Sequence, residues 1–229
     1  TGEKVSVKDT LEVLRRNPYV WMVGLMYFGY SFVTGMGINT YFFTWVVGNL
    51  DLMGTASLIG VVALPLLFFF PTIMKKVTKG LLVQIACIFY IIAGLIIYHL
   101  SGNFGMVLLS FLFTGIASLP ITYMTDLMML DVGTYNQHIS GKRMDGTIGA
   151  IKGFLGKVGG AVGVGVVGFM LEAAGYNGTA ETQTEGALTM IRFLIGYLPV
   201  IIFAAVAIMM IFYKLDAMLP ELNKEQNAD

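Results

Sequence analysis

Charge is scarce in this sequence. Only 12% of its 229 residues are Asp, Glu, Lys or Arg, whereas a soluble domain usually has about 25%. Apolar residues take their place, since 56% of the chain is hydrophobic and its mean hydropathy is +0.77. These values exclude an ordinary soluble domain and predict a polytopic membrane protein.

Other absences narrow the function classes. Fourteen basic and fourteen acidic residues cancel, so no overall field attracts nucleic acid, and we expect no nucleic-acid partner. The single cysteine, Cys87, lies in an apolar run and excludes an intrachain disulfide. We also expect no resident metal and no cofactor. The first seventeen residues are polar and exclude a cleavable signal peptide at this end. Because the chain opens on Thr1, we expect a fragment or a processed product.

Six segments are long and apolar enough to cross a bilayer, which takes about 20 helical residues. They lie at about 19–47, 55–74, 81–100, 104–128, 148–171 and 188–213. The predicted fold is therefore an all-α polytopic membrane protein with six transmembrane helices, preceded by a segment at 1–18 and followed by a tail at 214–229. A weak similarity between "GMGINTYFFT" and "ASLPITYMTD" favours two three-helix repeats.

Orientation follows from the positions of Lys and Arg. With six spans, the two terminal segments and the 75–80 and 129–147 breaks all lie on one side. That side carries Lys4, Lys8, Arg15, Arg16, Lys75, Lys76, Lys79, Lys142, Arg143, Lys214 and Lys224. The other side carries Arg192 alone, so both termini are expected to be cytoplasmic.

The fifth predicted span holds two lysines. At 1.5 Å per residue, Lys152 lies about 7 Å and Lys157 about 15 Å inside the cytoplasmic end. Lys152 can reach the interface along its own stem, but Lys157 lies near the midplane, where an unpaired lysine costs about 3 kcal/mol. Lys157 must therefore face either a protein interior, as a structural ion pair, or a substrate or ion pathway. Glycines around it predict close helix packing.

The first and fourth spans hold hydroxyl, amide and aromatic side chains, which can line a polar cavity. We expect Asn39 and Tyr41 to contribute most, with Thr34 nearby and with Thr122 and Tyr123 as counterparts in the fourth span. The alternative is that these groups bond helix to helix.

A specific resemblance emerges from "DVGTYNQHISGKRMDGTIGAIKGFLGKVGGAVGVGVVGFMLEAAGY" (131–176). This stretch resembles the signature region of the glycoside–pentoside–hexuronide:cation symporters, the melibiose-carrier branch of the major facilitator superfamily. The matching positions are Asp131, Tyr135, Gly141, Arg143, Asp145, Gly146, Lys157 and Gly159. "YFFTWVVGN", "PTIMKKVTKG" and "GYNGTAETQTEGA" also resemble family segments. The resemblance covers essentially the whole chain and maps to the C-terminal six helices.

The resemblance implies a sugar:cation symporter that works by alternating access, present here as its C-terminal half. It places Lys157 beside the central sugar and cation sites, and it implies that Na⁺ or H⁺ binds mainly in the absent N-terminal half. It assigns a role in closing the cytoplasmic side to Asp131, Arg143 and Asp145. Thr134 and Gln137 stand where the family usually has acidic residues, so this charge network is thinner here. The alternative for these loop charges is a solvated surface.

Alternatives remain open. The chain is either half of a twelve-helix carrier or a half-sized protein that needs a partner half. We expect it to lie in the cell membrane, in contact with lipid, and to have no enzymatic activity. An intramembrane serine protease is disfavoured because "GYSF" (29–32) lacks the required second glycine. An aquaporin-like channel is disfavoured because no break is long, apolar and Asn-Pro-Ala-like.

Overall fold

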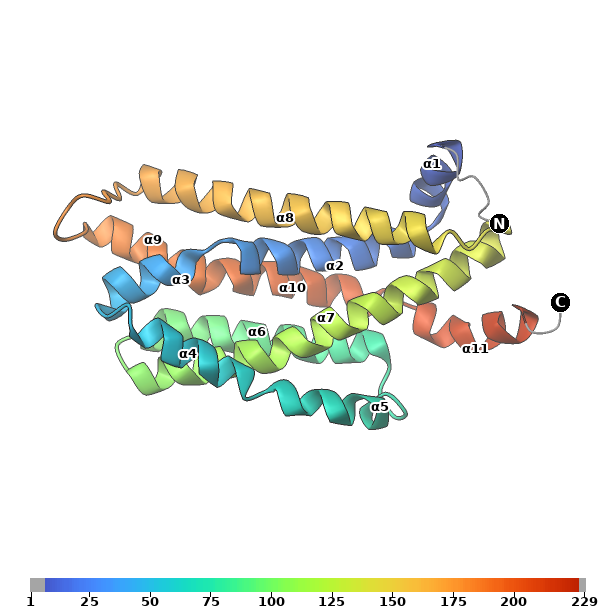
Figure 1. Ribbon diagram of the computed structural model, residues 1–229, viewed down its shortest axis with the longest axis horizontal. Helices are drawn as coiled ribbons and strands as arrows, with labels where there is room; N and C mark the ends of the chain where they lie inside the picture. Colours follow the sequence, from blue (N-terminus) through green and yellow to red (C-terminus); the bar gives the residue numbers. More distant parts are fainter. Residues whose placement is uncertain (1–6, 227–229) are drawn as a thin grey trace.

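The structure is a computed structural model that describes residues 7–226, and this range folds into helices joined by short turns (Figure 1). The all-α prediction is therefore confirmed. In chain order the helices are α1 (Val7–Arg16), α2 (Pro18–Gly35), α3 (Ile38–Tyr41), the π-helix η1 (Phe42–Val47), α4 (Leu52–Val61), the 3₁₀-helix η2 (Leu64–Phe69), α5 (Phe70–Ile73), α6 (Lys79–Leu100), α7 (Phe104–Ser140), α8 (Asp145–Ala173), α9 (Glu185–Ile195), α10 (Tyr197–Ile211) and α11 (Leu215–Gln226).

Within residues 7–226, five helical stretches are long and apolar enough to cross a membrane. They are Leu52–Ile73, Lys79–Leu100, Phe104–Ser140, Asp145–Ala173 and Glu185–Ile211, and they coincide with the second to sixth predicted spans. The first predicted span, 19–47, is not among them, and its first helix, α2, ends at Gly35. The count of six spans therefore stays a prediction.

Close packing and a left-handed turn divide the first predicted span. A Cβ on Gly35 would lie 2.7 Å from the Cα of Gly160, so only a glycine fits where α2 passes α8. Two residues later Gly37 has a φ of 64°, which ends the regular helix because L side chains rarely adopt that conformation. The chain resumes as α3 and η1, and η1 ends at Gly48, whose φ is 76°.

Other predicted spans differ at their ends or centres. Helix α7 continues beyond 128 to Ser140, so much of the predicted 129–147 break is helical. The last predicted span, 188–213, divides at Gly196 into α9 and α10, and Pro199 lies in the first turn of α10. A proline there removes a backbone donor that the first turn does not use. Pro120 lies inside α7, which continues through it.

The closest helix pair is α2 with α8, which run side by side (Figure 1). Gly156, Gly159 and Gly163 of α8 face α2, where an added Cβ would lie 2.4–2.6 Å from the Tyr27 ring or from the carbonyl oxygens of Phe28 and Phe32. Without these glycines the two backbones would have to separate. We call this contact the glycine seam. Four other glycines of α8, at 149, 153, 165 and 168, meet nothing within 4 Å and lie off the seam.

The segments on either side of the predicted spans are attached to α7. The side chain of Asn17 is fully buried, accepts a bond from the Tyr19 N–H, and donates to the carbonyl oxygen of Val132 at 3.3 Å. It therefore starts α2 and fixes that start to α7. Helix α11 forms within the predicted tail, and its Leu215 and Leu222 are buried. Residues 1–6 and 227–229 of the predicted end segments lie outside the described residues.

Substitution within the glycine seam should separate the two helices. Because a Cβ on Gly163 would lie 2.4 Å from the carbonyl oxygen of Phe32, we expect Gly163→Ala to lower the stability of the chain by about 1–3 kcal/mol. Gly165→Ala is the matched control, since nothing lies within 4 Å of it, and it should be neutral or stabilise by up to about 1 kcal/mol.

Thermal unfolding in detergent measures this effect. Cys87 is the only cysteine and is fully buried, so a thiol-reactive fluorophore labels it only as the bundle opens. Equal midpoints for the two alanine variants would contradict the seam.

Candidate functional site

A charged cluster connects three helices of the bundle. The ammonium group of Lys152 on α8 forms an ion pair with the carboxylate of Asp126 on α7. The same ammonium lies 4.7 Å from the ring centre of Tyr27 on α2. We call the surface formed by these three residues the α2–α7–α8 face. On it, the Lys152 side chain is 18% exposed and the Asp126 side chain 73% exposed.

Local packing explains how a lysine is held there. Gly156 lies one turn after Lys152, and its missing side chain leaves room for the Tyr27 ring. The ring of Tyr27 stacks on that of Tyr30 at 6.2 Å between centres. An aromatic face and a carboxylate both stabilise an ammonium group removed from water. Lys152 thus has a counter-ion within the chain, the Asp126 carboxylate, which the sequence analysis did not predict.

Lys157 differs from Lys152. It is exposed on α8, and among the described residues no hydrogen bond or ion pair to it is formed. Its exposed neighbour along the helix is Phe154, which is 67% exposed. The bundle therefore leaves Lys157 facing outward. Its role in a substrate or cation pathway stays a prediction.

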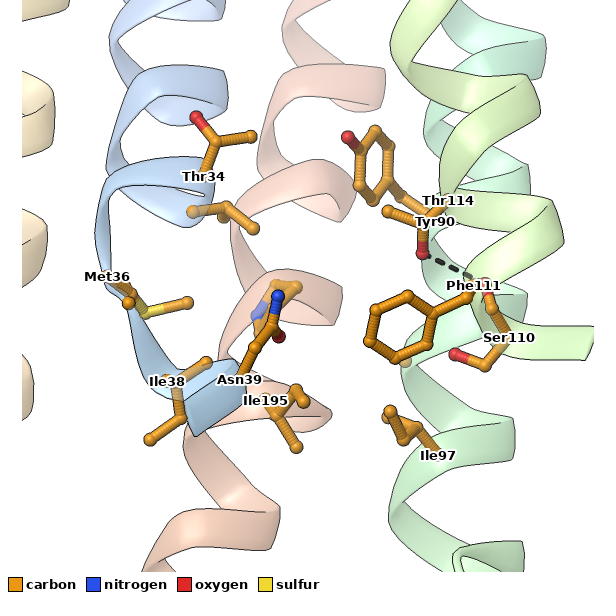
Figure 2. Close-up of a pocket in the computed structure, with 14 residues that line it drawn as sticks. Thr34, Met36, Ile38, Asn39, Tyr90, Ile97, Ser110, Phe111, Thr114 and Ile195 are labelled. Carbon is orange, nitrogen blue, oxygen red and sulfur yellow. Dashed lines mark hydrogen bonds between the residues drawn. The ribbon is translucent and has the colours of Figure 1, made fainter. Parts of the chain in front are cut away.

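Thr34 and Asn39 line a cavity of about 330 Å³ (Figure 2). The cavity lies beside the break between α2 and α3, and its other walls come from α6, α7 and the α9–α10 region. The hydroxyl of Thr34 donates to the carbonyl oxygen of Tyr30 at 2.9 Å. These two predicted residues are thus brought to one site.

The other three cavity candidates lie elsewhere. Tyr41 contacts Tyr176 edge to face, with ring centres 5.3 Å apart. Thr122 donates to the carbonyl oxygen of Ser118 on its own helix at 2.8 Å. Tyr123 is 42% exposed beside Phe70. None of the three lines the cavity, so the structure does not gather all the predicted polar residues into one pocket.

The three predicted gate residues form two separate ion pairs. Asp131 pairs with Lys79 of α6 at 2.5 Å, and both side chains are largely buried, at 16% and 20% exposed. Arg143 pairs with Asp145 at 2.8 Å, and both are about half exposed. Asp131 is therefore engaged within the bundle, whereas Arg143 and Asp145 remain accessible at its end.

Two residues near this end have no signal in the sequence analysis. The carboxylate of Asp216 on α11 accepts a bond from the Gly80 N–H at 2.8 Å, in the first turn of α6. The hydroxyl of Tyr213 is buried and has no hydrogen-bond partner among the described residues. Burial, helped by the negative charges of Asp131 and Asp216, raises the pKa of Tyr213, so it stays a neutral phenol. Asp216 lies in α11 and Tyr213 just before it, and the sequence analysis did not predict a helix in this tail.

Comparison with known proteins identifies the family. A family model described as MFS/sugar transport protein matches residues 2–217. The chain belongs to this family. Because the family consists of transporters, the predictions of a polytopic membrane protein and of no enzymatic activity are confirmed.

Several curated relatives are named for the transport of sugars or glycosides. The chain is 33% identical to a putative glycoside/cation symporter of Escherichia coli over 56% of this chain and 27% of that protein. It is 24% identical to an isoprimeverose transporter of Lactiplantibacillus pentosus over 96% of this chain and 47% of that protein. It is 27% identical to a lactose permease of Leuconostoc lactis over 93% and 34% respectively. These matches confirm the resemblance to glycoside:cation symporters, and the chain spans less than half the length of each relative.

Removal of the Asp126 carboxylate should destabilise the bundle. Because Lys152 is only 18% exposed, we expect Asp126→Asn to leave a poorly hydrated charge and lower stability by about 1–3 kcal/mol. Asp145→Asn is the matched control, since its ion pair is about half exposed, and it should change stability by at most about 1 kcal/mol.

Labelling of Cys87 during heating compares the two asparagine variants. The double variant Asp126→Asn/Lys152→Met, which removes both charges, should recover part of the loss. An Asp126→Asn midpoint equal to that of the parent chain would mean that the ion pair contributes nothing.

Proposed function

We propose that this chain is the C-terminal half of a sugar:cation symporter that works by alternating access. The family match over residues 2–217 carries the proposal, and the named sugar carriers among the relatives support it. The chain aligns with less than half of each of those proteins, so the transport cycle needs a second half. That half is either joined to this chain or supplied as a separate protein.

The second half is proposed to cover the α2–α7–α8 face. The face carries an exposed charge, because the Asp126 side chain is 73% exposed. A carboxylate and a lysine at one surface suit sugar hydroxyls, because the carboxylate accepts hydrogen bonds from them and the ammonium donates hydrogen bonds to their oxygens. Sugar would then bind between the halves and be exposed alternately to the two sides as the halves rock.

Lys157 is the residue we assign to the central pathway. Its outward position on α8 lets its ammonium reach a carboxylate of the second half, bound sugar, or water. Na⁺ or H⁺ is proposed to bind mainly to that second half. Within residues 7–226, no group of three or more His, Cys, Asp or Glu residues is placed to hold a metal ion.

We propose two different roles for the predicted gate residues, which form two separate ion pairs. Asp131 and Lys79 join α6 to α7 and are proposed to hold this half together as a rigid body. Arg143 and Asp145 are accessible and are proposed to pair across to the second half when the cytoplasmic side closes. The distribution of Lys and Arg supports a cytoplasmic location for this end of the bundle, with the protein in the cell membrane.

Replacement of Lys157 tests the pathway. In the assembled carrier, with the second half present, Lys157→Met should reduce cation-driven sugar uptake into proteoliposomes at least tenfold. Lys75→Met is the matched control because Lys75 lies in the exposed turn before α6, and it should leave uptake within about twofold. Immunoblotting of source membranes against the tail first shows whether the second half is on the same polypeptide. Uptake by Lys157→Met equal to that of the parent would remove this lysine from the pathway.

Substitution of Arg143 separates gating from stability. Because Arg143 is 46% exposed, Arg143→Gln should change stability by less than about 1 kcal/mol, yet shift the carrier toward the cytoplasm-open state. Asp131→Asn should have the opposite pattern: it should lower the stability of the bundle and leave the balance between the cytoplasm-open and cytoplasm-closed states unchanged. Labelling of a cysteine introduced on the cytoplasmic side reports the bias. An unchanged labelling rate in Arg143→Gln would leave this arginine without a gating role.

A further inference from the structure

The cavity beside the α2–α3 break is built entirely from this chain. Thr34 and Asn39 come from α2 and α3, whereas Tyr90, Phe111 and Thr114 come from α6 and α7 (Figure 2). Its volume of about 330 Å³ falls at the lower end of the roughly 300–1,000 Å³ typical of small-molecule sites. It has no part in the charged α2–α7–α8 face, because Asp126, Lys152 and Lys157 do not line it.

No charged side chain lines the cavity. Transfer of an ion from water into such a site has no compensating partner and is strongly unfavourable. Its occupant is therefore a neutral molecule, which excludes the coupling cation and anionic substrates.

The hydroxyl groups of the lining offer acceptors and no free donors. Ser110 donates to the carbonyl oxygen of Ala93, and Thr114 donates to that of Ser110, each at 2.9 Å. Thr34 is engaged in the same way with Tyr30. A hydroxyl has one proton and two lone pairs, so each of these oxygens retains a lone pair for a donor supplied from elsewhere.

Tyr90 follows the same rule. Its hydroxyl lies 2.7 Å from the hydroxyl of Ser118, and the proton of Ser118 is already given to the carbonyl oxygen of Thr114 at 2.8 Å. With that proton placed on the Thr114 carbonyl, Tyr90 is the donor to Ser118, and the Tyr90 oxygen keeps a lone pair. The lining thus has four hydroxyl acceptors, from Thr34, Tyr90, Ser110 and Thr114.

Asn39 supplies the complementary group. Its side chain points into the space opposite Phe111 and Thr114 (Figure 2), and among the described residues its amide has no hydrogen-bond partner. An amide both donates and accepts. Around these polar groups the lining is apolar and includes the Phe111 ring, Ile97 and Ile195.

We infer that this cavity binds a single neutral sugar ring. A pyranose carries several hydroxyl donors at its edge for the acceptor groups, and an apolar C–H face for the Phe111 ring. It needs no charged partner. The ligand class rests on the proposed function, whereas the site itself belongs to this chain alone. This half therefore recognises sugar before any second half is added.

Direct binding to the 229-residue chain tests the inference. The chain is placed in nanodiscs free of glycoside detergents, and neutral methyl pyranosides of the gluco, galacto and xylo series are examined by saturation-transfer NMR. At least one should bind. Its fully O-methylated form, which keeps the ring but has no donors, should not. Absence of binding across the series overturns the inference, and equal binding of the O-methylated form overturns it as well, since that identifies an apolar cavity for lipid.

Matched valine variants locate the binding. Thr114→Val removes one acceptor with little change of shape and should weaken binding about three- to tenfold. Thr125→Val is the control, because Thr125 makes the same bond to its own helix, is buried and does not line the cavity. Cys87 labelling checks that both variants fold. Equal weakening by both variants would place the sugar outside this cavity.

The outcome is separable from that of the proposed function. If the assembled carrier takes up sugar but the chain alone binds none, this inference fails and the symporter assignment stands. If the chain binds sugar but the assembled carrier moves none under any cation gradient, the symporter assignment fails and the cavity remains a sugar site.

Discussion

The close approach of α2 and α8 is the contact on which the rest of the bundle depends. Backbone meets backbone along the glycine seam, with Gly159 and Gly163 against the carbonyl oxygens of Phe28 and Phe32. This proximity places Tyr27 beneath Lys152 and so brings the lysine within reach of Asp126 on α7. The seam also holds α2 up to Gly35, where the chain turns away and the cavity begins.

The bundle thus has two polar regions, one of which is charged and one of which has no charged side chain. One is the charged α2–α7–α8 face, which presents the Asp126 carboxylate and the Lys152 ammonium beside the Tyr27 ring. The other is the neutral cavity, in which the hydroxyls of Thr34, Ser110 and Thr114 donate their hydrogen bonds to backbone carbonyl oxygens. Charged groups suit a shared surface where water and a second half complete their solvation. Neutral acceptors suit a site that must remain stable when no ligand is present.

Much of the fold was predictable from the sequence because apolar runs of about 20 residues have few stable arrangements. What was not predictable depended on tertiary contacts. The break at Gly35 requires Gly160 on another helix, and α11 folds because Leu215 and Leu222 find buried positions. The Lys152–Asp126 pair was missed for the same reason, since the two residues are 26 positions apart. Thr34 and Asn39 were recognised as cavity residues from their chemistry, but Tyr41, Thr122 and Tyr123 have equivalent chemistry and face elsewhere.

The extension of α7 toward Ser140 has a mechanical consequence. Its last turns bind the start of α2 through Asn17 and the start of α6 through Lys79, and α11 packs on the same helix. Three separate segments of the chain are thus attached to the same helix, α7. Because all three segments contact α7, a tilt of α7 should move the start of α2, the start of α6 and helix α11 together. A spin label on α11 would then report the orientation of the whole bundle.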